Sequence, residues 1–305
     1  MNNYKYYALI LFTTFLMGVA FPVGKIGLLY AAPFLLMGVR FVLAGSTLAV
    51  WTLIRKLPQP QNFSGWLKAA VIGIFQSAGV MGCAYYSMHW ITTGESAIIT
   101  SSSPLIVVLF GTLFTGARYR PLQWLGVMLG FAGIVVSFGF HIGLQPGTCI
   151  GLMGAVCFSA ATLLIKRWGS QFHMTALAAY QMLFGGGLLL LLSLLTEHTY
   201  LYINVTSTVV ILWLAVLCSI VQFSVWFYLL DKGDPGKTSS FLFLAPIFGV
   251  LSSWALLGES IAWEAVAGCV LVCLGIYLVN RSDSPRKVRN RRHGLGDRKC
   301  TTLSS

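Results

Sequence analysis

Long apolar segments follow one another along almost the whole chain, and this limits its fold more than any other feature. Each is about 20 residues long, the length at which an α-helix spans the hydrocarbon core of a bilayer. Only 9% of the 305 residues are charged, against about 25% in a typical soluble domain. Ten spans can be drawn, at roughly 6–28, 33–54, 66–87, 93–115, 121–140, 147–165, 174–195, 207–230, 236–257 and 262–280.

The basic residues test this number of spans. With the N-terminus placed in the cytoplasm, every Lys and Arg except Lys25 and Arg40 falls in a cytoplasmic loop or in the C-terminal tail. The positive-inside rule predicts this asymmetry, and one miscounted span would destroy it. We therefore expect an all-α membrane protein of the cell (inner) membrane, with ten transmembrane helices and both termini in the cytoplasm.

The chain also contains an internal repeat. Each half carries five spans, an odd number, so the second half must be inverted relative to the first. We therefore expect two inverted five-helix repeats, residues 1–142 and 143–280, as in secondary transporters with a substrate site near the bilayer midplane. A shift of 142 residues aligns Tyr86 with Tyr228, Gly94 with Gly236, Pro104 with Pro246, Gly126 with Gly268 and Gly133 with Gly275; a shift of 141 aligns Lys25 with Lys166 and Arg40 with Gln181.

Two prolines fall at equivalent depths, Pro104 in span 4 and Pro246 in span 9. A proline in a helix interior costs about 3 kcal/mol and frees a carbonyl that lipid cannot satisfy. Two interpretations stay open: a bend that lines a central pathway, or a kink that only shapes packing. Serine hydroxyls precede both prolines and could bond to the freed carbonyls: Ser101, Ser102, Ser103, Ser239 and Ser240.

These features carry a resemblance to a known family. The chain resembles the EamA-type family of the drug/metabolite transporter (DMT) superfamily over about residues 1–280. The resemblance implies ten transmembrane helices, cytoplasmic termini, export or exchange of small metabolites, and a cavity lined by spans 1, 3, 4, 6, 8 and 9. Met17 and Ala117 depart from the family, which commonly has tryptophan and glutamate there. The matching residues are Gly18, Phe21, Arg40, Phe41, Pro104, Pro246, Leu257, Gly258 and Glu259.

Arg40 is the sharpest candidate for a functional side chain. It lies several residues inside span 2, where an arginine costs about 2.5–3.5 kcal/mol on insertion scales and so faces protein or water. Its planar guanidinium could attract a substrate carboxylate or phosphate. The alternative is that it snorkels outward or binds loose carbonyls at a helix end.

Other polar side chains fall on spans that the resemblance assigns to the cavity. An aromatic pocket with a few amides and hydroxyls suits a small zwitterion or amphipathic metabolite. The alternative is helix packing with aromatic belts at the membrane interfaces. The substrate-binding candidates are Phe21, Arg40, Gln76, Ser101, Ser102, Pro104, Gln222, Trp226, Ser239, Ser240 and Pro246.

Coupling to an ion gradient has few candidates. No Asp or Glu lies deep in a span, so a proton relay through a buried carboxylate has little support. Glu95 lies at the outer start of span 4, where it favours the N-terminal helix dipole. Lys25 lies near the outer end of span 1, where snorkelling explains it. Coupling uses Glu95 or a lysine, or is absent.

Small residues indicate close helix packing in spans 5 and 7. Gly126, Gly130 and Gly133 recur at small-xxx-small spacing, and span 7 contains the triplet 185–187. Such stripes let helix backbones approach closely. We expect packing within one subunit, while a homodimer stays possible as an alternative.

Several function classes lack their motifs. No metal or cofactor site is expected, because the seven cysteines form no C-x-x-C pair and no H-E-x-x-H occurs. Half of the net charge of +12 lies in the tail 281–305, which we expect to be disordered, with no nucleic-acid partner. The sequence therefore predicts a secondary transporter, not an enzyme, that exports a small metabolite such as an amino acid. The alternatives are an intramembrane lipid-modifying enzyme and a non-transporting scaffold.

Overall fold

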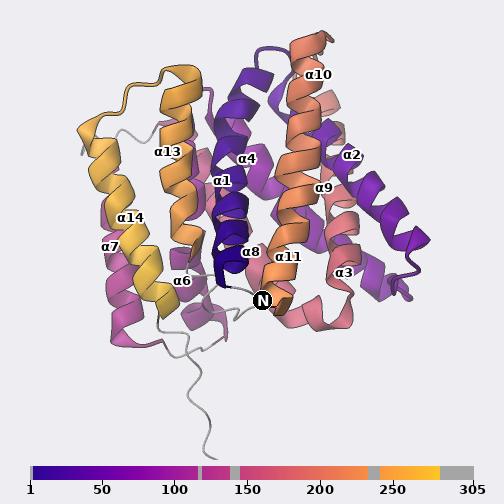
Figure 1. Ribbon diagram of the computed structural model, residues 1–305, viewed down its shortest axis with the longest axis horizontal. Coiled ribbons are helices and arrows are strands. Elements are labelled where there is room, and N and C mark those ends of the chain that lie inside the picture. Colours follow the sequence, from indigo (N-terminus) through magenta and orange to yellow (C-terminus); the bar gives the residue numbers. More distant parts are fainter. Residues whose placement is uncertain (1–2, 116–118, 138–144, 233–240, 282–305) are drawn as a thin grey trace, which may run out of the picture.

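The computed structural model describes residues 3–115, 119–137, 145–232 and 241–281, and these residues form a bundle of roughly parallel helices (Figure 1). The described residues contain no β-strand beyond one isolated bridge between Ala31 and Leu201. The expected all-helical class is confirmed. Of the predicted site residues, Ser239 and Ser240 lie outside the described residues, as does the tail from residue 282.

Within the described ranges, seven helical stretches are long and apolar enough to cross a membrane. Three shorter apolar helices coincide with predicted spans 5, 9 and 10; that these also cross the bilayer stays a prediction. The seven stretches are Tyr4–Gly27, Pro33–Ile54, Phe63–Ser87, Thr93–Leu113, Pro146–Gln171, Met174–Thr196 and Val205–Trp226, and the three shorter ones are Pro121–Ser137, Leu244–Leu257 and Trp263–Val279.

In the first half of the chain, two spans are interrupted. The third contains a π-helical segment and the fourth is broken at Ser102. The elements are α1 (Asn3–Gly27), α2 (Pro33–Ile54), α3 (Phe63–Gly73), η1 (Ile74–Gly79, π), α4 (Val80–Ser87), α5 (Thr93–Ser101), α6 (Ser103–Thr115) and α7 (Pro121–Ser137).

The second half shows interruptions at corresponding places. Its elements are α8 (Pro146–Trp168), η2 (Gly169–Gln171, 3₁₀), α9 (Met174–Thr196), α10 (Val205–Leu212), η3 (Trp213–Val221, π), α11 (Gln222–Lys232), η4 (Phe241–Phe243, 3₁₀), α13 (Leu244–Leu257) and α14 (Trp263–Arg281).

Neither repeat proline lies in a helix interior. Pro104 is the second residue of α6 and Pro246 the third residue of α13, after η4. The first-turn N–H groups of a helix have no intrahelical acceptor, so a proline there loses no hydrogen bond. The interior cost stated above therefore does not apply to these two residues. Pro22 does lie inside a helix, α1.

Two helix pairs share the most extensive contacts, α2 with α9 and α7 with α14. A Cβ atom on Gly126 would lie 2.7 Å from the Gly275 carbonyl oxygen, and one on Gly133 would lie 2.7 Å from that of Gly268. Backbone thus meets backbone along the α7–α14 seam, where only glycine fits. The small residues of α7 therefore pack within the chain; a homodimer stays a prediction.

The chain folds around two buried apolar clusters. The larger cluster joins α1, α2, α4, α9 and η3, and the smaller joins α5, α6, α7 and α14. Figure 1 places the N-terminus at one side of the bundle, called here the N side, and the α13–α14 connection at the opposite side, called the far side.

At the far side the α1–α2 and α9–α10 connections are joined by backbone. The Ala32 N–H donates to the Tyr200 carbonyl at 3.3 Å, and the Tyr202 N–H donates to the Tyr30 carbonyl at 2.8 Å. The Tyr200 hydroxyl donates to the Leu28 carbonyl at 2.9 Å. These bonds fasten a connection of the first half to one of the second half.

Candidate functional site

The Arg40 side chain is buried inside the bundle, with 2% of its surface exposed. Its Nε donates to the Ser219 hydroxyl at 2.9 Å, and one terminal nitrogen donates to the Cys218 carbonyl at 2.9 Å. The guanidinium also lies 5.1 Å from the centre of the Phe41 ring. Arg40 therefore does not snorkel outward. The alternative interpretation expected Arg40 to bind carbonyls at a helix end. It does bind a carbonyl, that of Cys218, but this carbonyl lies within a span.

The carbonyl that accepts from Arg40 belongs to the π-helical segment η3. A π-helix bonds i to i+5, which widens the turn and is frequent at functional sites. The Ser219 hydroxyl donates to the Leu214 carbonyl, five residues earlier, at 3.0 Å. Among the described residues no carboxylate bonds to Arg40, so dipoles alone surround this buried charge.

A second polar pair occupies the equivalent place in the other half. The buried Ser77, in η1, donates to the Gln181 side-chain oxygen at 3.1 Å. The 142-residue shift places η1 on the last six residues of η3 and Ser77 on Ser219. Arg40 and Gln181 are each the eighth residue of their helix, α2 and α9. Each pair thus joins one half of the chain to the other.

Tyr85 links the Arg40 region to α1. Its hydroxyl donates to the Ala20 carbonyl at 2.5 Å, and the charge of Arg40 lies close enough to act on it. Its ring stacks on Phe21, with centroids 6.4 Å apart. A Cβ atom on Gly24 would overlap the Tyr85 ring at 1.9 Å, so glycine is required there. Two predicted residues, Phe21 and Arg40, therefore meet around a tyrosine that was not among the candidates.

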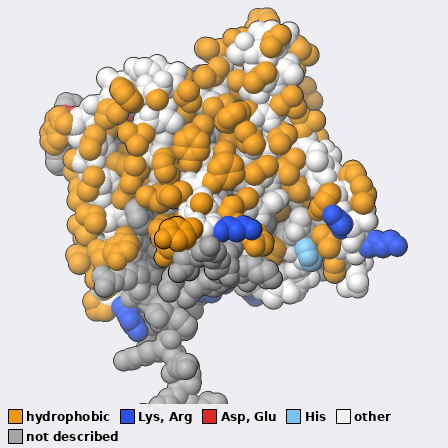
Figure 2. Space-filling view, viewed as in Figure 1, with side chains coloured by type: hydrophobic (Ala, Val, Ile, Leu, Met, Phe, Trp, Pro, Cys, Tyr) orange, Lys and Arg blue, Asp and Glu red, His pale blue; other side chains and the backbone are white. Residues whose placement is uncertain are grey.

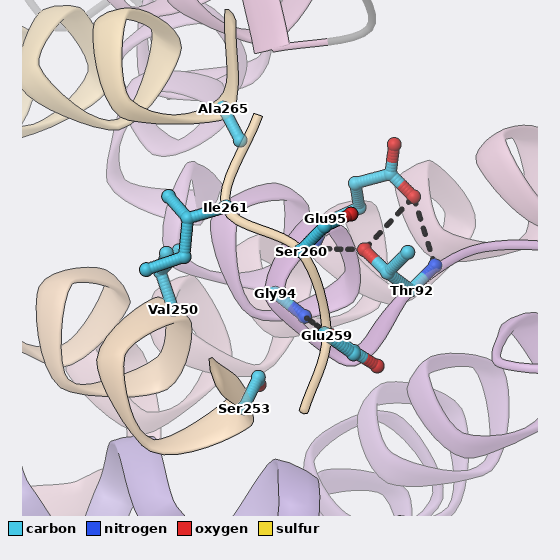
Figure 3. A pocket seen from close by; sticks show the side chains of 9 residues that line it. All are labelled: Thr92, Gly94, Glu95, Val250, Ser253, Glu259, Ser260, Ile261 and Ala265. Atoms are coloured by element: carbon cyan, nitrogen blue, oxygen red, sulfur yellow. Dashed lines mark hydrogen bonds between the residues drawn. The ribbon is translucent and has the colours of Figure 1, made fainter. Parts of the chain in front are cut away.

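The far side holds a pocket between α5, α13 and the start of α14 (Figure 3). Glu259, from the α13–α14 connection, accepts from the Thr93 N–H at 3.1 Å and from the Gly94 N–H at 3.4 Å. The Thr93 hydroxyl donates to Ser253 of α13 at 2.7 Å. Glu95 forms a capping box with Thr92, which confirms the expected placement of its carboxylate at the α5 N-terminus.

Lys25 lies near the same pocket. Its half-buried side chain donates to the Met88 carbonyl, and its charge interacts with that of Glu259. The pocket encloses about 280 Å³ including its open mouth, and none of the predicted substrate-binding residues lines it. Sequence reasoning missed this site because Glu259 was read only as part of a family motif.

The remaining described candidates are spread over several helices. Gln76 is half-buried in η1, and Trp226 is half-buried in α11. The buried Gln222 accepts from the Thr13 hydroxyl through its backbone carbonyl at 3.2 Å. Ser102 donates to the Ile99 carbonyl at 2.6 Å, where span 4 breaks. The half-buried Ser101 lies one residue before it.

No group of three or more His, Cys, Asp or Glu that could hold a metal ion occurs in the described part of the chain. The six described cysteines are free thiols. The Cys269 and Cys273 sulfurs lie 4.0 Å apart on successive turns of α14. These thiols behave as small apolar side chains in the bundle.

Comparison with known proteins gives one family. The profile described as "EamA-like transporter family" matches residues 4–139 and, a second time, residues 145–281. The Uncharacterized transporter YvbV of Bacillus subtilis is 27% identical, with 92% of each chain covered. The Uncharacterized inner membrane transporter YedA of Escherichia coli is 29% identical, covering 86% of this chain and 88% of YedA.

A more distant relative and a solved structure extend the comparison. The chloroplastic WAT1-related protein At3g02690 of Arabidopsis thaliana is 25% identical, over 87% of this chain and 67% of that protein. A crystal structure that is 21% identical superposes with a TM-score of 0.66 and covers 88% of this chain and 94% of its own. That likeness shows a shared fold.

Proposed function

This chain belongs to the EamA-like transporter family, and from that premise we propose that it is a secondary transporter that exports a small amphipathic metabolite, such as an amino acid. Two inverted five-helix halves, residues 1–142 and 143–280, alternate access to a site between them. The observation that carries the proposal is the repeated family match, once in each half.

Crossed contacts between the halves support the inverted arrangement. Under the 142-residue shift, Gly126 corresponds to Gly268 and Gly133 to Gly275. The contact of Gly126 with Gly275 therefore corresponds to the contact of Gly268 with Gly133, and both occur. A two-fold axis between the halves produces such crossed pairs, as it does at a symmetric dimer interface.

The charge distribution supports the orientation. On the face shown in Figure 2, the Lys and Arg side chains gather near the N side, and the upper part of the bundle is apolar. We therefore propose that the N side faces the cytoplasm, with both termini there, in the cell membrane. One relative, YedA, is named an inner membrane transporter.

We propose that the substrate path runs along α1, α4, α5, α8, α11 and α13, past Phe21, Tyr85 and Arg40. The buried charge of Arg40, which has no carboxylate partner among the described residues, suits a carboxylate on the substrate. The other residues proposed to face the path are Gln76, Ser101, Ser102, Pro104, Gln222, Trp226, Ser239, Ser240 and Pro246.

Counterflow in liposomes tests this function. Vesicles containing the purified protein are loaded with unlabelled amino acids, organic acids, amines or nucleotides, and the uptake of each labelled solute is followed. A carrier gives a transient overshoot for one class. The absence of an overshoot with every class, under conditions where the protein is folded, would refute the carrier.

A matched pair of tryptophan variants tests the path. Trp226→Ala removes a half-buried ring proposed to face the substrate, so the KM for uptake is expected to rise. Trp124→Ala removes an exposed ring of α7 and is expected to leave the KM unchanged. Equal effects of the two changes would place Trp226 outside the path.

A further inference from the structure

Two cysteine side chains meet on one face of α14. Cys269 and Cys273 are four residues apart, a spacing that places side chains next to each other on a helix surface. Their sulfur atoms lie 4.0 Å apart, and both side chains are buried, with 6% and 7% of their surfaces exposed. The helix backbone therefore holds two thiols side by side inside the bundle.

Packing alone does not require a thiol at either position. The 142-residue shift aligns Cys269 with Val127 and Cys273 with Phe131 of α7, the helix that packs against α14. Val127 is buried in the same apolar cluster as the two cysteines, and Phe131 packs against that cluster. An aliphatic and an aromatic side chain thus fill the equivalent places of the first half, and at these places only α14 carries thiols.

The surroundings of the pair do not suit hard cations. Apart from the two cysteines, every buried member of the cluster is Ile, Leu or Val. Ca²⁺ and Mg²⁺ take about six oxygen ligands, and Zn²⁺ takes about four ligands. The described part of the chain holds no group of three or more His, Cys, Asp or Glu that could complete such a shell. Thiolate sulfur is a soft ligand, and two thiolates complete the shell of a soft cation that is coordinated linearly.

The charge balance favours a divalent cation. Thiolates, not thiols, bind metals, so both S–H bonds break, two metal–sulfur bonds form and two protons leave to water. Nothing is oxidised or reduced in this step. A divalent cation then leaves a neutral site. A monovalent cation would leave a negative charge in an apolar interior, where an unpaired charge is strongly unfavourable.

We propose that Cys269 and Cys273 form a binding site for a soft, linearly coordinated divalent cation, with Hg²⁺ as the probe. Two metal–sulfur bonds of about 2.3 Å in line place the sulfurs about 4.6 Å apart, against 4.0 Å between the two thiols. A small rotation of either side chain makes up the difference. Gly268 and Gly275 lie on either side of the pair and against the α7 backbone, so the ion is bound beside the seam between the two halves. The site is independent of the transported substrate.

Retention of mercury against a competing thiol tests the site. The purified full-length protein, with its thiols reduced, receives Hg²⁺ in detergent and is then washed with a moderate excess of 2-mercaptoethanol. A single cysteine loses its mercury to the competitor. A pair on one helix keeps it, because the second thiol acts at a high effective concentration. Bound mercury is counted by native mass spectrometry, and coordination by two thiolates is followed by its ultraviolet absorption.

Two variants each leave one thiol of the pair. Cys269→Val introduces the side chain found at the equivalent Val127, and Cys273→Ala removes the other sulfur. Both are expected to retain about one mercury ion fewer per protein than the unaltered chain, and to lose the ultraviolet absorption of that ion. Cys149→Ala is the matched control, because Cys149 is exposed on α8. It is expected to retain as much mercury as the unaltered chain.

The two variants of the pair decide the outcome. Full retention of mercury in either Cys269→Val or Cys273→Ala would overturn the proposal, since one thiol of the pair would then suffice. An equal loss in Cys149→Ala would also overturn it, because the metal would then bind exposed thiols without selection. Thermal unfolding without metal checks that each protein is folded, and if one variant of the pair does not fold, the other carries the test. Because no substrate is added, a counterflow experiment that finds no cargo leaves this result intact.

Discussion

Replacing Ser219 with alanine is expected to destabilise the bundle more than replacing Ser77, although the two serines are equivalent in the repeat. Ser219 accepts from the charged guanidinium of Arg40 at 2.9 Å, and hydrogen bonds to charged groups contribute about 1.5–3 kcal/mol. Ser77 donates to a neutral amide at 3.1 Å, and neutral hydrogen bonds between membrane helices average about 0.6 kcal/mol. Both serines are buried, so exposure does not separate them.

Expected losses in the free energy of unfolding are therefore about 2 kcal/mol for Ser219→Ala and about 0.6 kcal/mol for Ser77→Ala. The measurement is reversible unfolding in bicelles, with Ser46→Ala as the control because Ser46 is exposed and bonds only within its own helix. A loss from Ser77→Ala equal to or larger than that from Ser219→Ala would refute the reasoning. It would mean that the Cys218 carbonyl alone satisfies Arg40.

Two further outcomes are expected. Gly133→Ala places a Cβ 2.7 Å from the Gly268 carbonyl oxygen and is expected to lower the free energy of unfolding by about 1–3 kcal/mol. The control Gly187→Ala meets nothing within 4 Å and is expected to leave it unchanged. Equal losses from the two variants would exclude close backbone contact between α7 and α14. Burial raises the pKa of Tyr200 above its ordinary value of 10.0, so the folded state holds this proton when the unfolded state has released it. Stability is then expected to fall as the pH rises through about 10, and less so in Tyr200→Phe, which pH-dependent unfolding measures.

The helical class could be predicted from the sequence because apolar length alone decides it in a bilayer. The repeat could also be found from the sequence. Gly126 and Gly268 each lie against the backbone of another helix, where only glycine fits, so both halves carry glycine at this position. The π-helical segments could not be found. Residues 213–221 are strongly apolar, like the rest of their span, and hydropathy does not distinguish a wide helical turn from a normal one.

The candidate site was predicted less completely than the fold. Arg40 stood out because a charge within a span needs an explanation. Its partner Ser219 did not stand out, because a serine is common in membrane helices and its role depends on which helix crosses it. Glu259 was read only as part of a family motif, because its contacts depend on two N–H groups of α5 that lie 165 and 166 positions away in the sequence.

The backbone pairing between residues 30–32 and 200–202 has a consequence for how the bundle can widen. Backbone hydrogen bonds join these two connections, so this part of the far side resists separation. The α5–α13 rim on the same side is held by side chains whose bonds can be exchanged for water. We therefore expect any opening on the far side to form between α5 and α13, while the two paired connections stay together.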